Sequence, residues 1–201
     1  MHISEGILSG PVLLSGVAIA VVGTAIGLKK LDYDRIPQAG ILAASFFIAS
    51  LVHLPFGAGS VHLVFNGLIG LILGWGAFPV ILVALILQAI LFQFGGLTTL
   101  GVNTVVMAMP AVMCYYVFQR VLNINKAKTS YLAFICGFSA VLLSSLLMAS
   151  SLIFSGEEFL QIASLAVITH LPVMIVEGFI TAFCIGFLYK VQPSILHSYS
   201  T

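Results

Sequence analysis

Charged residues are scarce in this chain: only 6% of its 201 residues are Asp, Glu, Lys or Arg, and the formal net charge is +1. So weak a charge excludes the basic surface that binding to nucleic acid requires. The chain also lacks paired cysteine motifs, because Cys114, Cys136 and Cys184 stand apart in apolar stretches without CxxC spacing. This spacing argues against a disulfide framework and against a thiolate metal cage.

Enzyme signatures are absent as well. The sequence contains no HExxH, no GxSxG and no P-loop pattern, the motifs that mark common metalloprotease, hydrolase and nucleotide sites. Any ATP-driven task would therefore need ATP hydrolysis by another subunit. We expect no cleavable signal peptide, since the first turn holds Glu5 and no Lys or Arg.

Hydrophobic residues make up 61% of the chain, and the mean hydropathy is +1.20. A soluble core could not hide this much apolar surface, so we predict an all-α polytopic membrane protein with one transmembrane domain, residues 1–201. Seven spans are predicted, at residues 7–28, 39–52, 61–75, 79–94, 102–121, 131–154 and 172–189. The second, third and fourth are shorter than the ~20 residues of a full crossing. Residues 159–171 would make an eighth span if they cross.

Seven crossings separate the cations from most of the histidines. All seven cations then fall on one side: Lys29, Lys30, Arg35, Arg120, Lys126, Lys128 and Lys190. The positive-inside rule makes that side the cytoplasm, with the N-terminus outside and the C-terminus inside. Four of the five histidines fall on the outer face: His2, His53, His62 and His170. Only His197 is expected inside.

Small residues recur at helical spacing in two spans. They are Ala18, Gly23 and Gly27 in the first span and Gly67, Gly70 and Gly74 in the third. Such residues let helix backbones approach closely. The contacts they predict are either internal or with a partner subunit.

The Met1-His2 start can hold a transition metal. We expect Met1 to keep its free amine, because the second residue is large. The amine, the deprotonated amide nitrogen of His2 and the His2 imidazole would then chelate one ion in a plane. That geometry favours nickel(II) or copper(II) and leaves one planar position open. We assign that position to His62, which follows a flexible loop, although a histidine at the end of a span is also typical of a solvated interface.

His53, His170 and Glu177 are further candidates near this face. His53 is an axial ligand, a partner that orients His62, or an interface residue. If one helix continued through Pro172, His170 and Glu177 would share a face, and the carboxylate could brace the histidine. The alternative is a protonated Glu177 that is hydrogen-bonded between helices.

Asn66 and Asn103 stand at the starts of spans. Each could supply an amide that fixes a ligand or the N-terminal segment. Capping a helix is the alternative duty of an asparagine at such a position. Asn103 ends the glycine-rich outer segment 94–103, which is expected to line the same cavity.

The chain resembles the CbiM/NikM family of cobalt and nickel transport proteins over nearly its whole length. Four segments carry the resemblance: MHISEGIL (1–8), SVHL (60–63), FGGLTTLGVN (94–103) and Glu177-Gly178. The resemblance implies a seven-helix substrate-binding subunit of an energy-coupling factor (ECF) ABC transporter in the cell membrane. It implies that Met1, His2 and His62 hold Co²⁺ or Ni²⁺ as transported ligand, with no cofactor.

The implied partners are a transmembrane coupling (T) protein, cytoplasmic ATPase subunits and often a small accessory membrane protein. The sequence does not choose between cobalt and nickel. Neighbouring genes for cobalamin biosynthesis, or for urease and hydrogenase, would decide. Three alternatives stay open: a vitamin-binding ECF subunit, a channel or secondary carrier, and a metal-dependent membrane hydrolase using His53, His62, His170 and Glu177.

Overall fold

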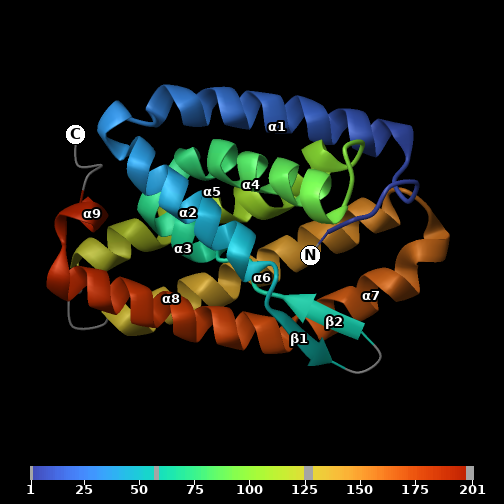
Figure 1. The fold of residues 1–201 in the computed structure, drawn as a ribbon. Helices are drawn as coiled ribbons and strands as arrows, with labels where there is room; N and C mark the ends of the chain where they lie inside the picture. The colour runs from blue at the N-terminus through green and yellow to red at the C-terminus, as the bar shows by residue number, and fades with distance from the viewer. Residues whose placement is uncertain (1, 57–58, 125–128, 198–201) are drawn as a thin grey trace.

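The computed structural model describes residues 2–56, 59–124 and 129–197. Most of them form a bundle of helices (Figure 1). The helices are α1 (Gly10–Lys30), α2 (Ile36–Ala49), α3 (Asn66–Leu73), α4 (Ala77–Phe92), α5 (Leu100–Ile124), α6 (Thr129–Ile153), α7 (Leu160–Thr169), α8 (Leu171–Val191) and α9 (Ser194–His197). Short 3-10 turns lie between some of them, and those in the described residues are Tyr33–Arg35, Gly74–Gly76 and Glu157–Phe159. The predicted helical membrane fold is confirmed at this level.

A short β-hairpin interrupts the helical pattern. Strands β1 (His53–Phe56) and β2 (Gly59–His62) pair antiparallel, with His53 opposite His62. We predicted a span from residue 61, and this start is wrong, because α3 begins only at Asn66 and Phe65 has a left-handed backbone with a φ of 57°. Helices α1, α2, α4, α5, α6 and α8 begin and end within a few residues of the predicted spans.

Five helical segments in the described part of the chain are long and apolar enough to cross a membrane. They are Gly10–Lys30, Asn66–Phe92, Leu100–Phe118, Thr129–Ile153 and Glu157–Val191. The second and the fifth each contain two α-helices. This pattern is that of a multi-pass membrane protein.

The segment Asn66–Phe92 reverses direction near its middle. Before and after it, His62 and Phe94 both pack against the ring of His2, at centroid distances of 4.8 and 5.8 Å. Its central Trp75 instead approaches Gly27, near the far end of α1. Because the two flanks meet at one end of the bundle and the middle lies at the other, α3 and α4 run in opposite directions.

Helix α7 is too short to cross the hydrocarbon alone. Its 10 residues span about 15 Å, roughly half of the apolar thickness of a bilayer. Helix α3 is shorter still, with 8 residues, and each of these two short helices belongs to a longer apolar segment together with its neighbour. The alternative in which residues 159–171 form an eighth crossing therefore stays a prediction.

Small residues bring the helices of the bundle into close contact. A Cβ on Gly70 would lie 2.2 Å from the carbonyl oxygen of Ala111, and one on Gly27 would lie 2.4 Å from that of Trp75. Gly23 likewise faces Phe78, and Gly67 faces Gly137. The close approach predicted for these glycines is therefore made within the chain.

Candidate metal centre

The segment before α1 is threaded into one end of the bundle, the end that also carries the hairpin and α7 (Figure 1). Ile3 and Leu8 are buried. Asn103 on α5 holds Ile3 from both sides: its Oδ1 accepts from the backbone N–H at 2.9 Å, and its Nδ2 donates to the carbonyl oxygen at 3.1 Å. Asn103 was predicted either to fix a ligand or the N-terminal segment or to cap a helix, and its contacts with Ile3 fix the N-terminal segment.

Two further contacts hold this segment along its length. The backbone N–H of Thr98 donates to Glu5 Oε1 at 3.1 Å, and that of Ser9 donates to Ser155 Oγ at 3.1 Å. The hydrogen bond from Thr98 lowers the pKa of the exposed Glu5 carboxyl below its ordinary value. Gly96 is required beside this contact, because a Cβ there would lie 2.0 Å from Cγ of Glu5.

The fold brings His2 and His62 together across 60 residues of sequence. Nδ1 of His2 lies 3.0 Å from Nε2 of His62, and the His62 side chain is buried. Two nitrogens bound at right angles to one ion, each at about 2.0 Å, would be about 2.8 Å apart. The 3.0 Å between the two nitrogens is the distance of a direct hydrogen bond and is also close to that of neighbouring ligands in a square plane. Met1, the third predicted ligand residue, lies outside the described residues.

Gln88 on α4 is a neighbour of His2 that the sequence analysis missed. Its Oε1 lies 2.7 Å from Nε2 of His2, and its Nε2 donates to Ser50 Oγ at 2.9 Å. Both Gln88 and Ser50 are fully buried. A signal was available, since Gln88 is the only polar side chain in the helix Ala77–Phe92.

Glu177 contacts the loop that follows His62. Its carboxyl group accepts hydrogen bonds from the backbone N–H groups of Val64 and Phe65. The predicted brace for His170 fails because α7 ends at Thr169 and α8 starts at Leu171, so no unbroken helix joins the two side chains. The carboxyl group therefore shapes the backbone next to His62.

His170 lies buried between α7 and α8, where its Nδ1 donates to the carbonyl oxygen of Ala166 at 2.6 Å. The backbone of His53 pairs with that of His62, and the His53 side chain lies outside the described part of the structure. Across the residues that are described, no group of three or more His, Cys, Asp and Glu side chains gathers around a common point.

Asn66 does not reach the histidine pair. Its Nδ2 donates to the carbonyl oxygen of Met107 at 3.1 Å and to Ser144 Oγ at 2.8 Å. These bonds tie the start of α3 to α5 and α6. Its Oδ1 has no hydrogen-bond partner among the described residues, so the hydrogen bonds of Asn66 that are seen there join helices and do not cap its own.

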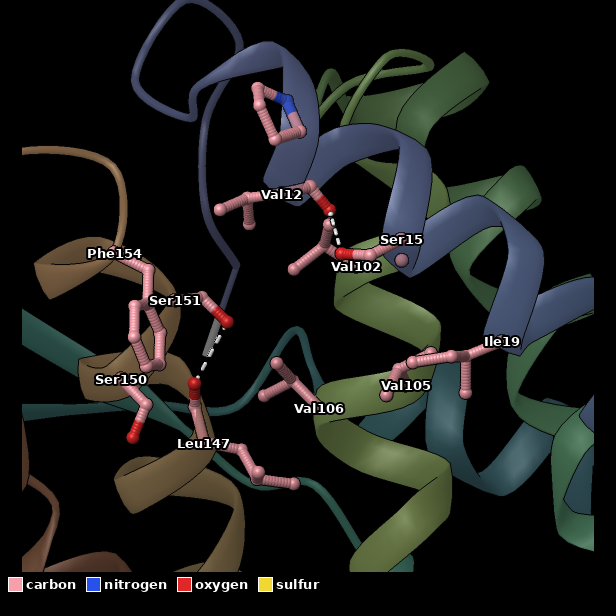
Figure 2. A pocket seen from close by; sticks show the side chains of 12 residues that line it. Val12, Ser15, Ile19, Val102, Val105, Val106, Leu147, Ser150, Ser151 and Phe154 are labelled. Carbon is pink, nitrogen blue, oxygen red and sulfur yellow. Dashed lines mark hydrogen bonds between the residues drawn. The ribbon is translucent and has the colours of Figure 1, made fainter.

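A separate apolar groove of about 460 Å³ lies between α1, α5 and α6 (Figure 2). The hydroxyl groups of Ser15 and Ser151 in its wall donate to Val12 and Leu147, in their own helices, at 2.9 Å. No charged side chain lines it. The groove thus offers no ligand set for a metal ion, and the candidate centre remains the His2 and His62 pair.

Comparison with known proteins gives the family. The family described as "Cobalt uptake substrate-specific transmembrane region" matches residues 2–195. A putative metal transport protein of Haemophilus influenzae is 41% identical, over 98% of this chain and 97% of that protein. A putative fused nickel transport protein NikMN of Archaeoglobus fulgidus is 31% identical, over 98% of this chain and 68% of that protein.

The fold is also that of a solved structure. The crystal structure of a transition metal transporter superposes with a TM-score of 0.83 at 28% identity, covering all of this chain (100%) and 98% of the other. Relatives of this kind are named as transport proteins, and the chain is accordingly a transporter component of the membrane rather than an enzyme. The chain belongs to the CbiM family of cobalt uptake transmembrane proteins.

Proposed function

We propose that this protein captures Co²⁺ or Ni²⁺ with high affinity at the outer face of the membrane, as the substrate-binding subunit of an ECF transporter. The observation that carries the proposal is the 3.0 Å approach of His2 Nδ1 to His62 Nε2. In the proposed site, the amine of Met1 and the amide nitrogen of His2 complete a plane of four nitrogens. The metal ion is cargo, so the site must also release it.

The hydrogen bonds that fix the N-terminal segment support the assignment of His2 as a metal ligand. Asn103 fixes Ile3 directly after His2, and Gln88 contacts the ring itself. Ligands fixed in advance lose little conformational freedom when they bind, and this favours affinity. A flexible terminus would lose more.

The proposed topology has seven crossings, with the N-terminus outside. The reversal at Gly74–Gly76 supports it, because it makes two passes out of one apolar segment. Lys29 and Lys30 end α1 at the end of the bundle opposite His2. If this cationic end faces the cytoplasm, the metal site faces outward.

The proposed partners are a T protein, cytoplasmic ATPase subunits and a small accessory membrane subunit. A relative named as a fused NikMN protein supports a complex, since its name joins two components in one chain. The family description names cobalt and this relative names nickel. Both metals therefore belong in the test.

Isothermal titration of the purified protein with Ni²⁺ and Co²⁺ tests the proposal. The native N-terminus must be kept, with any tag placed after Thr201. We expect His2→Ala and His62→Ala each to weaken binding at least about a hundredfold, since each removes a planar ligand. His197→Ala is the matched control and should bind like wild type. Unchanged nickel and cobalt affinity of His2→Ala would contradict the proposal.

A second variant tests the amine. A short N-terminal extension without histidine blocks Met1 and leaves every side chain in place. We expect it to abolish tight binding while the thermal unfolding midpoint stays unchanged. Tight binding with the extension would exclude the amine as a ligand.

A further inference from the structure

A chain of buried hydrogen bonds runs from the end of α2 to the ring of His2. Ser50 Oγ donates to the carbonyl oxygen of Phe47 at 2.7 Å. Phe47 lies in the last turn of α2. Because a carbonyl can only accept, the single hydroxyl proton of Ser50 is used there, and toward Gln88 the hydroxyl can only accept.

The donor-to-acceptor direction of these hydrogen bonds determines which ring nitrogen of His2 carries the hydrogen. Gln88 must place its amide NH₂ toward Ser50 and its carbonyl oxygen toward Nε2 of His2, at 2.9 and 2.7 Å. The carbonyl oxygen only accepts, so Nε2 of His2 carries the hydrogen. In a neutral imidazole Nδ1 then has a lone pair and no hydrogen.

The tautomer of His62 is also determined by a hydrogen bond, which its Nδ1 makes on the side of the ring away from His2. Its Nδ1 lies 2.8 Å from the carbonyl oxygen of Leu63, so this nitrogen is the donor and Nε2 is the acceptor. The nitrogens that face each other at 3.0 Å, His2 Nδ1 and His62 Nε2, are therefore both acceptors. Two acceptors at this distance repel each other unless a positive charge lies between them. A proton or a metal ion supplies it.

We infer that Gln88, oriented by Ser50, is a positioning residue that selects the Nε2-protonated tautomer of His2 and so presents Nδ1 to the metal ion. The inference rests on the proposed function of His2 as a ligand. Only Nδ1 can close a chelate ring with the amide nitrogen of the same residue. Without Gln88 the ring can adopt the other tautomer, in which a hydrogen on Nδ1 blocks that ring closure.

The test compares Gln88→Met with Gln88→Glu. Methionine keeps the length of the side chain and removes the acceptor, whereas glutamate keeps an oxygen acceptor toward Nε2. We expect Gln88→Met to lower nickel affinity about 10- to 100-fold, as for other residues that orient a ligand. Gln88→Glu should stay within about threefold of wild type. Gln161→Met, on exposed α7, is the matched control and should bind like wild type.

The tautomer itself is measured without metal. Nitrogen-15 NMR of the histidine rings, with the His2 signals assigned from the spectrum of His2→Ala, reports which ring nitrogen carries the hydrogen. We expect the Nε2-protonated form in wild type and in Gln88→Glu, and a mixture in Gln88→Met. A wild-type tautomer in Gln88→Met, or an equal loss of affinity in both variants, would overturn the inference. Failure of the proposed function would be seen in a different experiment: His2→Ala would bind the metal ion as tightly as wild type.

Discussion

The metal end and the middle of the bundle are held together by different forces. At the metal end, directional hydrogen bonds from Asn103, Gln88 and Glu177 fix the backbone and the rings. In the middle, glycines such as Gly70 let helix backbones approach closely, and the contacts there are van der Waals contacts between complementary surfaces. Lipid offers no hydrophobic drive between helices, so close packing must hold the bundle. Changes at the two regions should therefore fail in different ways.

Glu177 is fully buried at the metal end, and Glu177→Leu has the largest expected effect. The change leaves the buried N–H group of Val64 and the half-buried N–H group of Phe65 without their acceptor. At roughly 1–3 kcal/mol for each buried group, we expect a loss of about 2–6 kcal/mol in stability, together with weaker nickel binding. Thermal unfolding in detergent and calorimetric titration measure the two effects.

Glu177→Gln is the graded control, because it retains one acceptor oxygen. It should fall between wild type and Glu177→Leu in both measurements. If Glu177→Leu bound nickel as wild type does, the loop after His62 would hold its shape without the carboxyl group.

Gly70→Ala should damage the packed middle alone. Its Cβ would lie 2.2 Å from the carbonyl oxygen of Ala111, which belongs to the backbone of α5 and cannot turn away. Overpacking of this kind costs about 1–3 kcal/mol, and the unfolding midpoint should fall accordingly. Gly40→Ala is the matched control, since nothing lies within 4 Å of a Cβ there. Equal midpoints for the two variants would show that α3 and α5 can separate freely.

Asn103→Ala should damage the metal end alone. Ile3 would lose two backbone hydrogen bonds, worth about 2 kcal/mol together, or roughly thirtyfold in nickel affinity. The unfolding midpoint should change little, because the contacts between the helices stay in place. Ser164→Ala, whose hydroxyl donates only within α7, provides the comparison. A fall in the midpoint without a loss of affinity would assign Asn103 to the bundle instead.

Glu5→Gln has the smallest expected effect, because the Glu5 carboxyl is exposed. Its lowered pKa means that the ionised form is favoured in the fold, so the contact with Thr98 is present at neutral pH and is lost as the pH falls through the lowered pKa. The NMR shift of the Thr98 amide proton should follow this titration, with a midpoint below 4.5, the ordinary value. Glu5→Gln should abolish the titration and change nickel affinity less than about fivefold. A midpoint at or above the ordinary value would show that the contact does not favour the charged form.

The helices and the histidine pair could be predicted because their signals are local. Apolar runs predicted the helices, and the position of His2 beside the terminus, with His62 next to a flexible loop, pointed to one site. The hairpin could not be predicted, since residues 53–62 contain a proline and two glycines typical of a loop, and strand pairing depends on contacts between its two halves. The brace between His170 and Glu177 depended on one helix continuing through Pro172, and that condition is not met because the helix breaks at His170.

The sequence by itself determined that this is a helical membrane protein and which residue types could hold a metal ion, because composition and residue chemistry do not depend on contacts. Only the tertiary structure decided how those residues are oriented. Ser50, Gln88 and His2 lie far apart along the chain and meet through the packing of α2, α4 and the N-terminal segment. A hydrogen bond is directional and acts over about 3 Å, so only the fold can determine which nitrogen of His2 carries the hydrogen.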